Sequence, residues 1–158
     1  RILEAFENYR GTLFNIENRT QTPASQLISL TQRLRQNLNE HGLEVGDRVI
    51  VAASNGVPFI AALMAILQCK GTPILSFWQS PAGELQRLAS QWKARFILSE
   101  ISLEFDSPDI RNHGRWSYDG HLSFEWNENL IQNYPEHSFP DLPGTLSQGE
   151  MLFRSRSL

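Results

Sequence analysis

The feature that most constrains the fold is an alternation of short apolar runs and helical segments between Gly46 and Glu100. Three apolar runs have the length of buried strands, at residues 49–53, 73–77 and 95–99. A helical segment lies in each interval, and the first one, which ends before Gly71, is apolar on nearly all sides. Unbroken apolar strands that alternate with helices are typical of a parallel sheet covered on both faces. The sequence therefore predicts an α/β fold, a mainly parallel sheet around a Rossmann- or flavodoxin-like βαβαβ core.

We expect residues 1–158 to form a single domain in which residues 1–45 add an N-terminal strand and helix to the core. Residues 12–16 predict a short strand, and residues 20–22 its return partner. Thr22 and Pro23 then predict a helix start, with Thr22 as the cap. Leucines at spacings of three and four indicate one buried stripe, at Leu27, Leu30, Leu34 and Leu38. Gly42 and Leu43 predict a Schellman ending.

Residues 101–158 predict a C-terminal β-hairpin followed by a loop. The strands at 116–118 and 122–126 alternate apolar and polar residues, and Asp119-Gly120 between them is a strong turn signal. The aromatic residues Trp116, Tyr118, Phe124 and Trp126 are compatible with a ligand-stacking platform, but such a face more often covers a sheet. Residues 127–149 read as a loop, because they contain three prolines and no periodicity.

Local motifs predict no catalytic residue and no metal site, and the cofactor-binding residues stay unknown at this stage. The four histidines lack the sequence spacing of metal ligands; they are His41, His113, His121 and His137. The loop Ser54-Asn55-Gly56 could present N–H groups to a ligand, although capping and packing explain it more simply. Ser80 and Pro81 predict another capped helix start. Cys69 lies near a helix end, which disfavours a thiolate, so we expect it to be buried and unreactive.

Composition limits the class of protein. Net charge is −3, which argues against a nucleic-acid partner, and no apolar run is long enough to span a membrane. A single cysteine and the lack of a signal peptide make a cytoplasmic location the default expectation. Since the first residue is Arg1 and not Met, we expect the chain to be cut from a longer protein.

Several passages together resemble the adenylate-forming superfamily of acyl-CoA synthetases, luciferases and peptide-synthetase adenylation domains. Residues 42–49 resemble its G-x-x-x-G-D-R-V passage, and residues 54–59 the x-N-s-x-e-f that follows. Residues 63–75 resemble l-A-i-l-k-a-G-a-v-x-v-P-l, residues 81–85 its P-x-x-E-L, and residues 94–100 its a-k-v-l-i-t-d. The resemblance spans nearly the whole chain and implies the N-terminal subdomain of such an enzyme.

The family's phosphate loop reads [YF]-T-S-G-S-T-G-x-P-K, and residues 152–157 stand where it would begin. Arg154 replaces Thr and Arg156 replaces Gly, and the sequence ends before the rest of the loop. Glycine would let the backbone approach phosphate, whereas arginine brings a side chain into that space. No catalytic residue is therefore carried over, and whether the parent retains activity depends on these two positions.

The resemblance implies a parent that activates a carboxylic acid with ATP and magnesium and passes the acyl group to a thiol such as CoA or a carrier protein. Its partners would be the remainder of the parent chain, the acid and the thiol. We expect this part to be inactive alone and to hold no tightly bound cofactor. Two alternatives stay open: a non-catalytic relative that serves as a scaffold or interaction domain, and an unrelated flavodoxin-like binding module.

Overall fold

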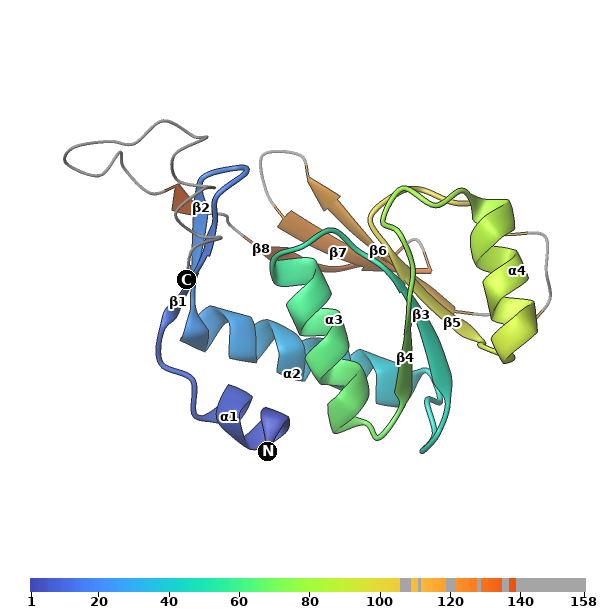
Figure 1. Ribbon diagram of the computed structural model, residues 1–158, viewed down its shortest axis with the longest axis horizontal. Helices are drawn as coiled ribbons and strands as arrows, with labels where there is room; N and C mark the ends of the chain where they lie inside the picture. Colours follow the sequence, from blue (N-terminus) through green and yellow to red (C-terminus); the bar gives the residue numbers. More distant parts are fainter. Residues whose placement is uncertain (106–108, 111, 119–121, 128, 135–136, 139–158) are drawn as a thin grey trace, which may run out of the picture.

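A six-stranded sheet in the order β4-β3-β5-β6-β7-β8 forms the centre of the fold (Figure 1). The computed structural model describes residues 1–105, 109–110, 112–118, 122–127, 129–134 and 137–138. The strands of this sheet are β3 (Arg48–Ala52), β4 (Thr72–Leu75), β5 (Phe96–Ser99), β6 (Asn112–Tyr118), β7 (Leu122–Trp126) and β8 (Asn129–Tyr134). The first four pair in parallel, while β7 and β8 continue the sheet in antiparallel. The predicted mainly parallel α/β fold is confirmed.

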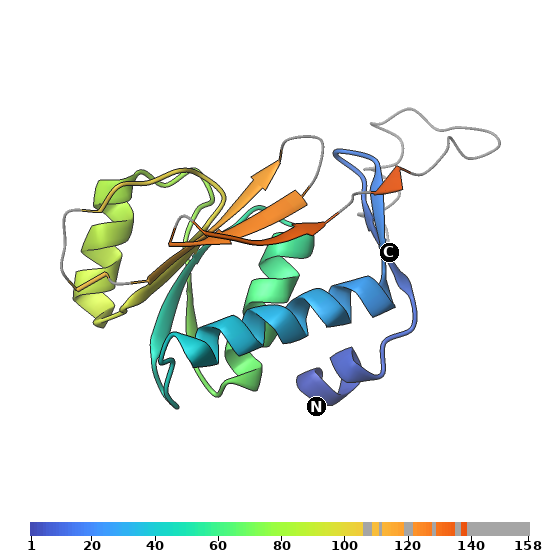
Figure 2. The same cartoon turned by 180° about the vertical axis from the view of Figure 1, so that it is seen from behind.

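Helices cover both faces of the parallel part (Figures 1 and 2). On one face, α2 (Ala24–Glu40) and α3 (Val57–Gln68) pack over Val49 and Val51. On the other, α4 (Ala82–Trp92) packs over Ile50 and Ala52. Because β3 is covered on both sides, its last four residues are all buried. This explains why the sequence of β3 shows an unbroken apolar run and no alternation.

One edge of the sheet is β4, which in the described part of the chain pairs with β3 alone. The N–H groups of Thr72 and Ser76 donate to carbonyls of the β3 segment, so alternation turns residues 73 and 75 toward the open edge. Pro73 therefore occupies an outward position where an N–H would be unpaired. A proline at such a place blunts an edge strand and disfavours pairing with another chain.

The helix ends agree with the sequence only in part. Gly42 has φ +85°, and Leu43 N donates to Leu38 O, which confirms the Schellman ending of α2. The predicted cap Thr22 is wrong: this residue is buried in β2, and Pro23 takes the N-cap position without a side-chain hydrogen bond. Ser80 likewise does not cap α4, since its hydroxyl lies 3.1 Å from that of Ser76 and Pro81 is the N-cap.

α3 ends before Gly71, as the sequence predicts. The residue with positive φ that follows it is Lys70, at 57°. Gly71 is needed for space, because a Cβ there would lie 3.0 Å from Cγ2 of Ile66 and 3.2 Å from the carbonyl oxygen of Asp47. The missing side chain of Gly71 therefore allows the close turn between α3 and β4.

The hairpin β6–β7 is confirmed, and its aromatic residues cover the sheet. Trp116, Phe124 and Trp126 lie buried in the core beneath α2 and α3, with Trp116 and Phe124 ring centroids 4.6 Å apart. They form no exposed stacking platform. The last pair of this hairpin is Tyr118 with Leu122, so three residues separate the two strands. The predicted turn residues Asp119 and Gly120 lie outside the described residues.

The loop predicted for residues 127–149 is partly wrong. Residues 129–134 form β8 beside β7, with a bulge opposite Phe124 and Glu125, and His137–Ser138 form β9. The irregular pairing of β8 explains why its sequence lacks a clear period of two. No helix in the described part of the chain has the length and apolarity needed to cross a membrane.

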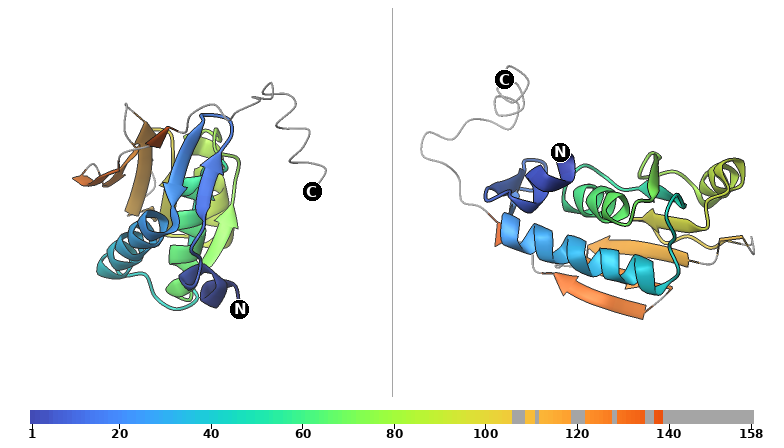
Figure 3. Two further views of the ribbon diagram at one scale, coloured as in Figure 1. Left: turned by 90° about the vertical axis from the view of Figure 1, so that its left-hand side faces the viewer. Right: turned by 90° about the horizontal axis from the view of Figure 1, so that it is seen from below.

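A second, three-stranded sheet lies at the N-terminal end of α2 and is built from β1 (Thr12–Asn15), β2 (Thr20–Pro23) and β9. Figure 3 shows the β1–β2 hairpin at the opposite end of the molecule from α4. The short helix α1 (Ile2–Glu7) precedes it and buries Phe6 against the main core. The N-terminal hairpin and the helix after it are therefore where the sequence predicted them.

Candidate functional site

The carboxyl ends of β3 and β5 form a switch point of the sheet. From β3 the chain passes through α3 to β4 on one side, and from β5 it passes to β6 on the other. In open α/β sheets, ligands bind at such points, where neighbouring strands connect in opposite directions. Here the carboxylate oxygen Oε1 of Glu100 accepts hydrogen bonds from the backbone N–H and the hydroxyl of Ser54, each 2.6 Å long.

This contact decides the role of the loop Ser54-Asn55-Gly56. A phosphate would need the loop N–H groups, but that of Ser54 already binds a carboxylate of the same chain. An anion placed here would also meet the negative charge of Glu100. The structural interpretation of the loop is therefore the better one: it ties β3 to β5 and leads into α3, whose N-cap is Gly56.

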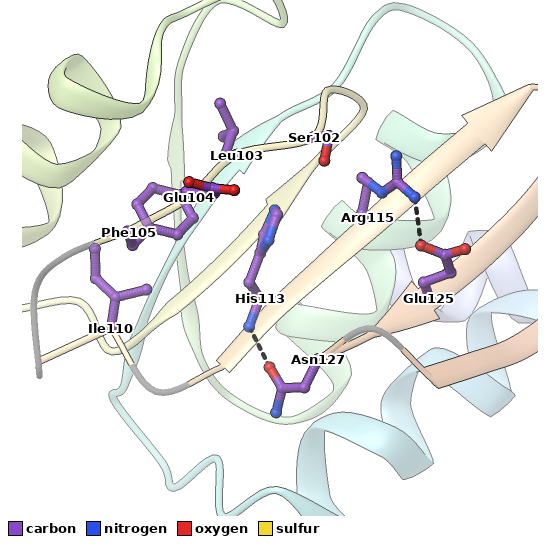
Figure 4. A pocket seen from close by; sticks show the side chains of 9 residues that line it. All are labelled: Ser102, Leu103, Glu104, Phe105, Ile110, His113, Arg115, Glu125 and Asn127. Atoms are coloured by element: carbon purple, nitrogen blue, oxygen red, sulfur yellow. Dashed lines mark hydrogen bonds and ion pairs between the residues drawn. The ribbon is translucent and has the colours of Figure 1, made fainter.

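A cavity of about 480 Å³ lies further along the sheet, over β6 and β7 (Figure 4). One wall is the segment that follows β5, with Ser102, Leu103, Glu104 and Phe105, together with Ile110. The other side is formed by the sheet, with His113, Arg115, Glu125 and Asn127. His113 pairs with Ile97 and Arg115 with Ser99 in the parallel ladder, so these side chains lie on the same face of the sheet as α4.

His113 is the most constrained group in this cavity. Its Nε2 lies 2.6 Å from the hydroxyl oxygen of the fully buried Ser99, and its ring meets that of Phe105 edge-on, with centroids 5.1 Å apart. The Ser99 hydroxyl donates its single proton to the carbonyl of Ile101, at 3.0 Å. The carbonyl of Ile101 can only accept, so the arrangement that satisfies all three groups has Ser99 donating to Ile101 and Nε2–H of His113 donating to Ser99, with Nδ1 as an acceptor.

Burial keeps this imidazole neutral. Desolvation, with a smaller contribution from the positive charge of Arg115, lowers the pKa of His113 to about 4. The backbone N–H of His113 donates to Oδ1 of Asn127 at 2.9 Å, which fixes the strand end beside the ring. The cavity therefore contains an oriented, uncharged hydrogen-bond acceptor at neutral pH.

An ion pair forms the base of the cavity. NH2 of Arg115 on β6 donates to Oε2 of Glu125, its direct partner on β7. The side chains are 30% and 28% exposed, so the pair is more shielded than an ordinary surface pair. Their charges cancel locally, and both side chains line the cavity.

The other residues considered from sequence do not converge on a site. Cys69 is half-buried, and not buried as predicted; its thiol donates to the carbonyl of Arg35 at 3.7 Å. The ring of His41 lies against that of the core residue Trp126, tilted by 46° with centroids 4.7 Å apart. Within the described ranges, no three His, Cys, Asp or Glu residues gather as a metal site would require. His121, Arg154 and Arg156 lie outside the described residues, as does the side chain of His137.

Sequence reasoning missed the cavity because it began the hairpin strand at Trp116. The signal was present: residues 112–118 alternate, with His113 and Arg115 on one face and Gly114 and Trp116 on the other. What the alternation does not give is the partner strand of each residue. Only the pairing of β6 with both β5 and β7 brings Ser99, His113 and Glu125 together.

Comparison with protein families gives a match to the family described as AMP-binding enzyme, over residues 7–133. Solved structures with a similar fold include CmiS6 (TM-score 0.59, 15% identity, covering 83% of this chain and 32% of that one). Another is O-succinylbenzoate coenzyme A synthetase (MenE) from Bacillus subtilis in complex with AMP (TM-score 0.55, 17% identity, covering 66% and 28%). A third is the luciferase-like enzyme from the mealworm Zophobas morio (TM-score 0.55, 19% identity, covering 63% and 24%).

At these identities the structural likeness concerns the fold. The chain spans no more than about a third of the length of these three structures, at 32%, 28% and 24%. Among curated protein sequences, no match was found.

Proposed function

The chain belongs to the AMP-binding enzyme family, and on this premise we propose that it is the N-terminal part of an ATP-dependent, AMP-forming carboxylic acid ligase. The parent would activate a carboxylate as an acyl-adenylate and transfer the acyl group to a thiol, either CoA or a carrier protein, as an acyl-CoA synthetase does. The cytoplasm is the proposed location, where such thiols are available.

The family match over residues 7–133 is the observation that carries this proposal. The fold supports it, since proteins with a similar arrangement include a coenzyme A synthetase bound to AMP. The flavodoxin-like alternative is less well supported, because the parallel strands here continue into the antiparallel strands β7 and β8.

ATP and magnesium do not fit the described residues. Magnesium prefers carboxylate and other oxygen ligands, and the described part of the chain gathers no acidic cluster. At the switch point of the sheet, the N–H of Ser54 is already bound by Glu100. We therefore assign no step of the reaction to these residues. In our proposal this part supplies a rigid scaffold, and it is inactive without the rest of the parent chain.

The experiment is an assay of pyrophosphate release with ATP, magnesium and a panel of fatty, aryl and amino acids. We expect acid-dependent release by the full-length parent and none by residues 1–158 alone. Release by residues 1–158 alone would overturn the scaffold role. A folded parent that releases no pyrophosphate with any acid would overturn the ligase proposal and favour a non-catalytic relative.

A further inference from the structure

The cavity over β6 and β7 exists because α4 covers only part of its face of the sheet. α4 packs on β3 and β5, whereas, among the described residues, the segment after β5 lies over β6 and β7 on this face. The side chains that β6 and β7 turn to this face are polar or charged, at His113, Arg115, Ser117, Ser123 and Glu125. A solvated sheet face would also be polar, so specific recognition depends on how these groups are paired and oriented.

The ion pair at the base limits the charge of a ligand. An anion that contacts Arg115 would also meet the negative charge of Glu125, and a cation that contacts Glu125 would also meet the positive charge of Arg115. To escape this repulsion the ligand would have to break the pair, which leaves one half-buried charge without its partner and is costly. An uncharged molecule leaves the pair intact and can still use its outer atoms. Guanidinium N–H groups of Arg115 offer donors, and Oε1 of Glu125 offers an acceptor.

The imidazole adds a second acceptor on the same side. Since Nε2 of His113 donates to Ser99, Nδ1 has its lone pair available, and the described residues provide no partner for it. A ligand that satisfies this wall needs N–H groups for Nδ1 and Glu125, and an oxygen that accepts from Arg115. An amide carries both functions in one small planar group.

The opposite wall is apolar. Leu103, Phe105 and Ile110 pack against the core formed by α4 and the sheet, and each is partly buried. Phe105 is held by its edge-on contact with His113. A volume of about 480 Å³ lies within the range of small-molecule sites, which typically combine an apolar wall with a few placed polar groups.

We propose that this cavity binds a small, uncharged planar aromatic amide of the nicotinamide or pyrimidine-base type. Its ring lies against Phe105 and Ile110, its carbonyl oxygen accepts from Arg115, and its N–H groups donate to Glu125 and His113. Binding in this cavity does not require ATP.

The test is a titration of residues 1–158, labelled with ¹⁵N, with nicotinamide and then with nicotinate, which differs only in carrying a carboxylate in place of the amide. We expect saturable amide shifts centred on residues 113–115 and 125–127, with a Kd of about 1 mM for nicotinamide. Uracil should shift the same signals. Nicotinate and the cation benzylamine should each bind at least about tenfold more weakly than nicotinamide.

Two variants make the test specific. Glu125→Gln keeps the shape but leaves Arg115 without a carboxylate partner, so the preference should reverse and nicotinate should bind more tightly than nicotinamide. Asp47→Asn is the matched control, because it breaks the Arg95–Asp47 pair, whose atoms lie 2.8 Å apart and outside this cavity. The control should keep the original preference, and a melting curve of each variant confirms that it is folded.

The proposal is overturned if nicotinamide and uracil cause no saturable shifts in the folded wild-type chain at about 10 mM, roughly ten times the expected Kd. It is also overturned if nicotinate or benzylamine binds as well as nicotinamide, or if Glu125→Gln leaves the order of affinities unchanged. None of these outcomes bears on pyrophosphate release by the parent, so the two proposals fail or stand independently.

Discussion

Glu100 at the end of β5 and Ser54 after β3 are joined by two hydrogen bonds to one carboxylate oxygen, each 2.6 Å long. The two residues are 46 positions apart in the sequence. Their contact closes the sheet at its switch point and takes up an N–H that an anionic ligand would otherwise use. A position typical of ligand binding in related architectures is therefore a structural tie in this chain.

Removing this tie should destabilise the protein. Glu100→Ala leaves the Ser54 N–H without its charged acceptor, so we expect a loss of about 2 kcal/mol in the free energy of unfolding. The measurement is the urea midpoint of unfolding, compared between variants that have the same m-value. Glu84→Ala is the control, because Glu84 pairs with Arg87 on the exposed surface of α4 and should contribute less than about 0.5 kcal/mol. Equal losses in the two variants would contradict the role assigned to Glu100.

His113 should make stability depend on pH between about 4 and 6.5. Its pKa in the folded protein is lowered to about 4 from an ordinary 6.5, so in this window the unfolded chain binds more protons. This contribution is constant above pH 6.5 and is lost as the pH falls toward 4, by up to about 3 kcal/mol. Urea unfolding at several pH values measures it. In His113→Gln the slope between pH 5 and 6.5 should flatten, and an unchanged slope would contradict the prediction.

Gly114 should tolerate no side chain. A Cβ there would lie 2.6 Å from Cδ2 of Leu98 and 2.6 Å from Cζ of Phe124. Since Leu98 is fully buried and Phe124 nearly so, Gly114→Ala should cost about 1–3 kcal/mol through overpacking. Gly83→Ala in α4 is the matched control: apart from its chain neighbours and the backbone of its own helix, no atom would lie within 4 Å of an added Cβ, and alanine favours a helix. A melting temperature that falls for Gly114→Ala and holds or rises for Gly83→Ala would agree with this packing.

Cys69 should react slowly with thiol reagents in the folded protein. Partial burial raises the pKa of its thiol, and the positive charge of Arg35 only partly offsets this effect. At neutral pH we expect slower labelling than in denaturant. Arg35→Gln removes the offsetting charge and should slow the labelling of the native protein further. Labelling of the native wild-type chain at the denatured rate would contradict both expectations.

The strands and helices of the core could be predicted from sequence because their signals are local. The apolar run of β3, the leucine stripe of α2 and the glycine after it each reflect burial or backbone geometry within a few residues. The ends of α2 and α4 were less predictable. Thr22 and Ser80 are suitable cap residues, but Thr22 pairs with Leu13 in a hairpin and Ser80 interacts with Ser76. For Thr22, strand pairing took the backbone position that capping requires. For Ser80, the neighbouring Ser76 took the hydroxyl.

From the sequence alone, the order of the elements up to β7, the class of fold and the family resemblance could be determined, because periodicity and turn residues act over short distances. The sequence left the aromatic residues of β6 and β7 open between a ligand platform and a sheet cover. The tertiary structure decided for the cover, and it also placed Ser99, His113, Arg115 and Glu125 around one cavity. The reason is that strand order and register are set by pairing between distant segments, and a shift of one residue would turn every one of these side chains to the other face.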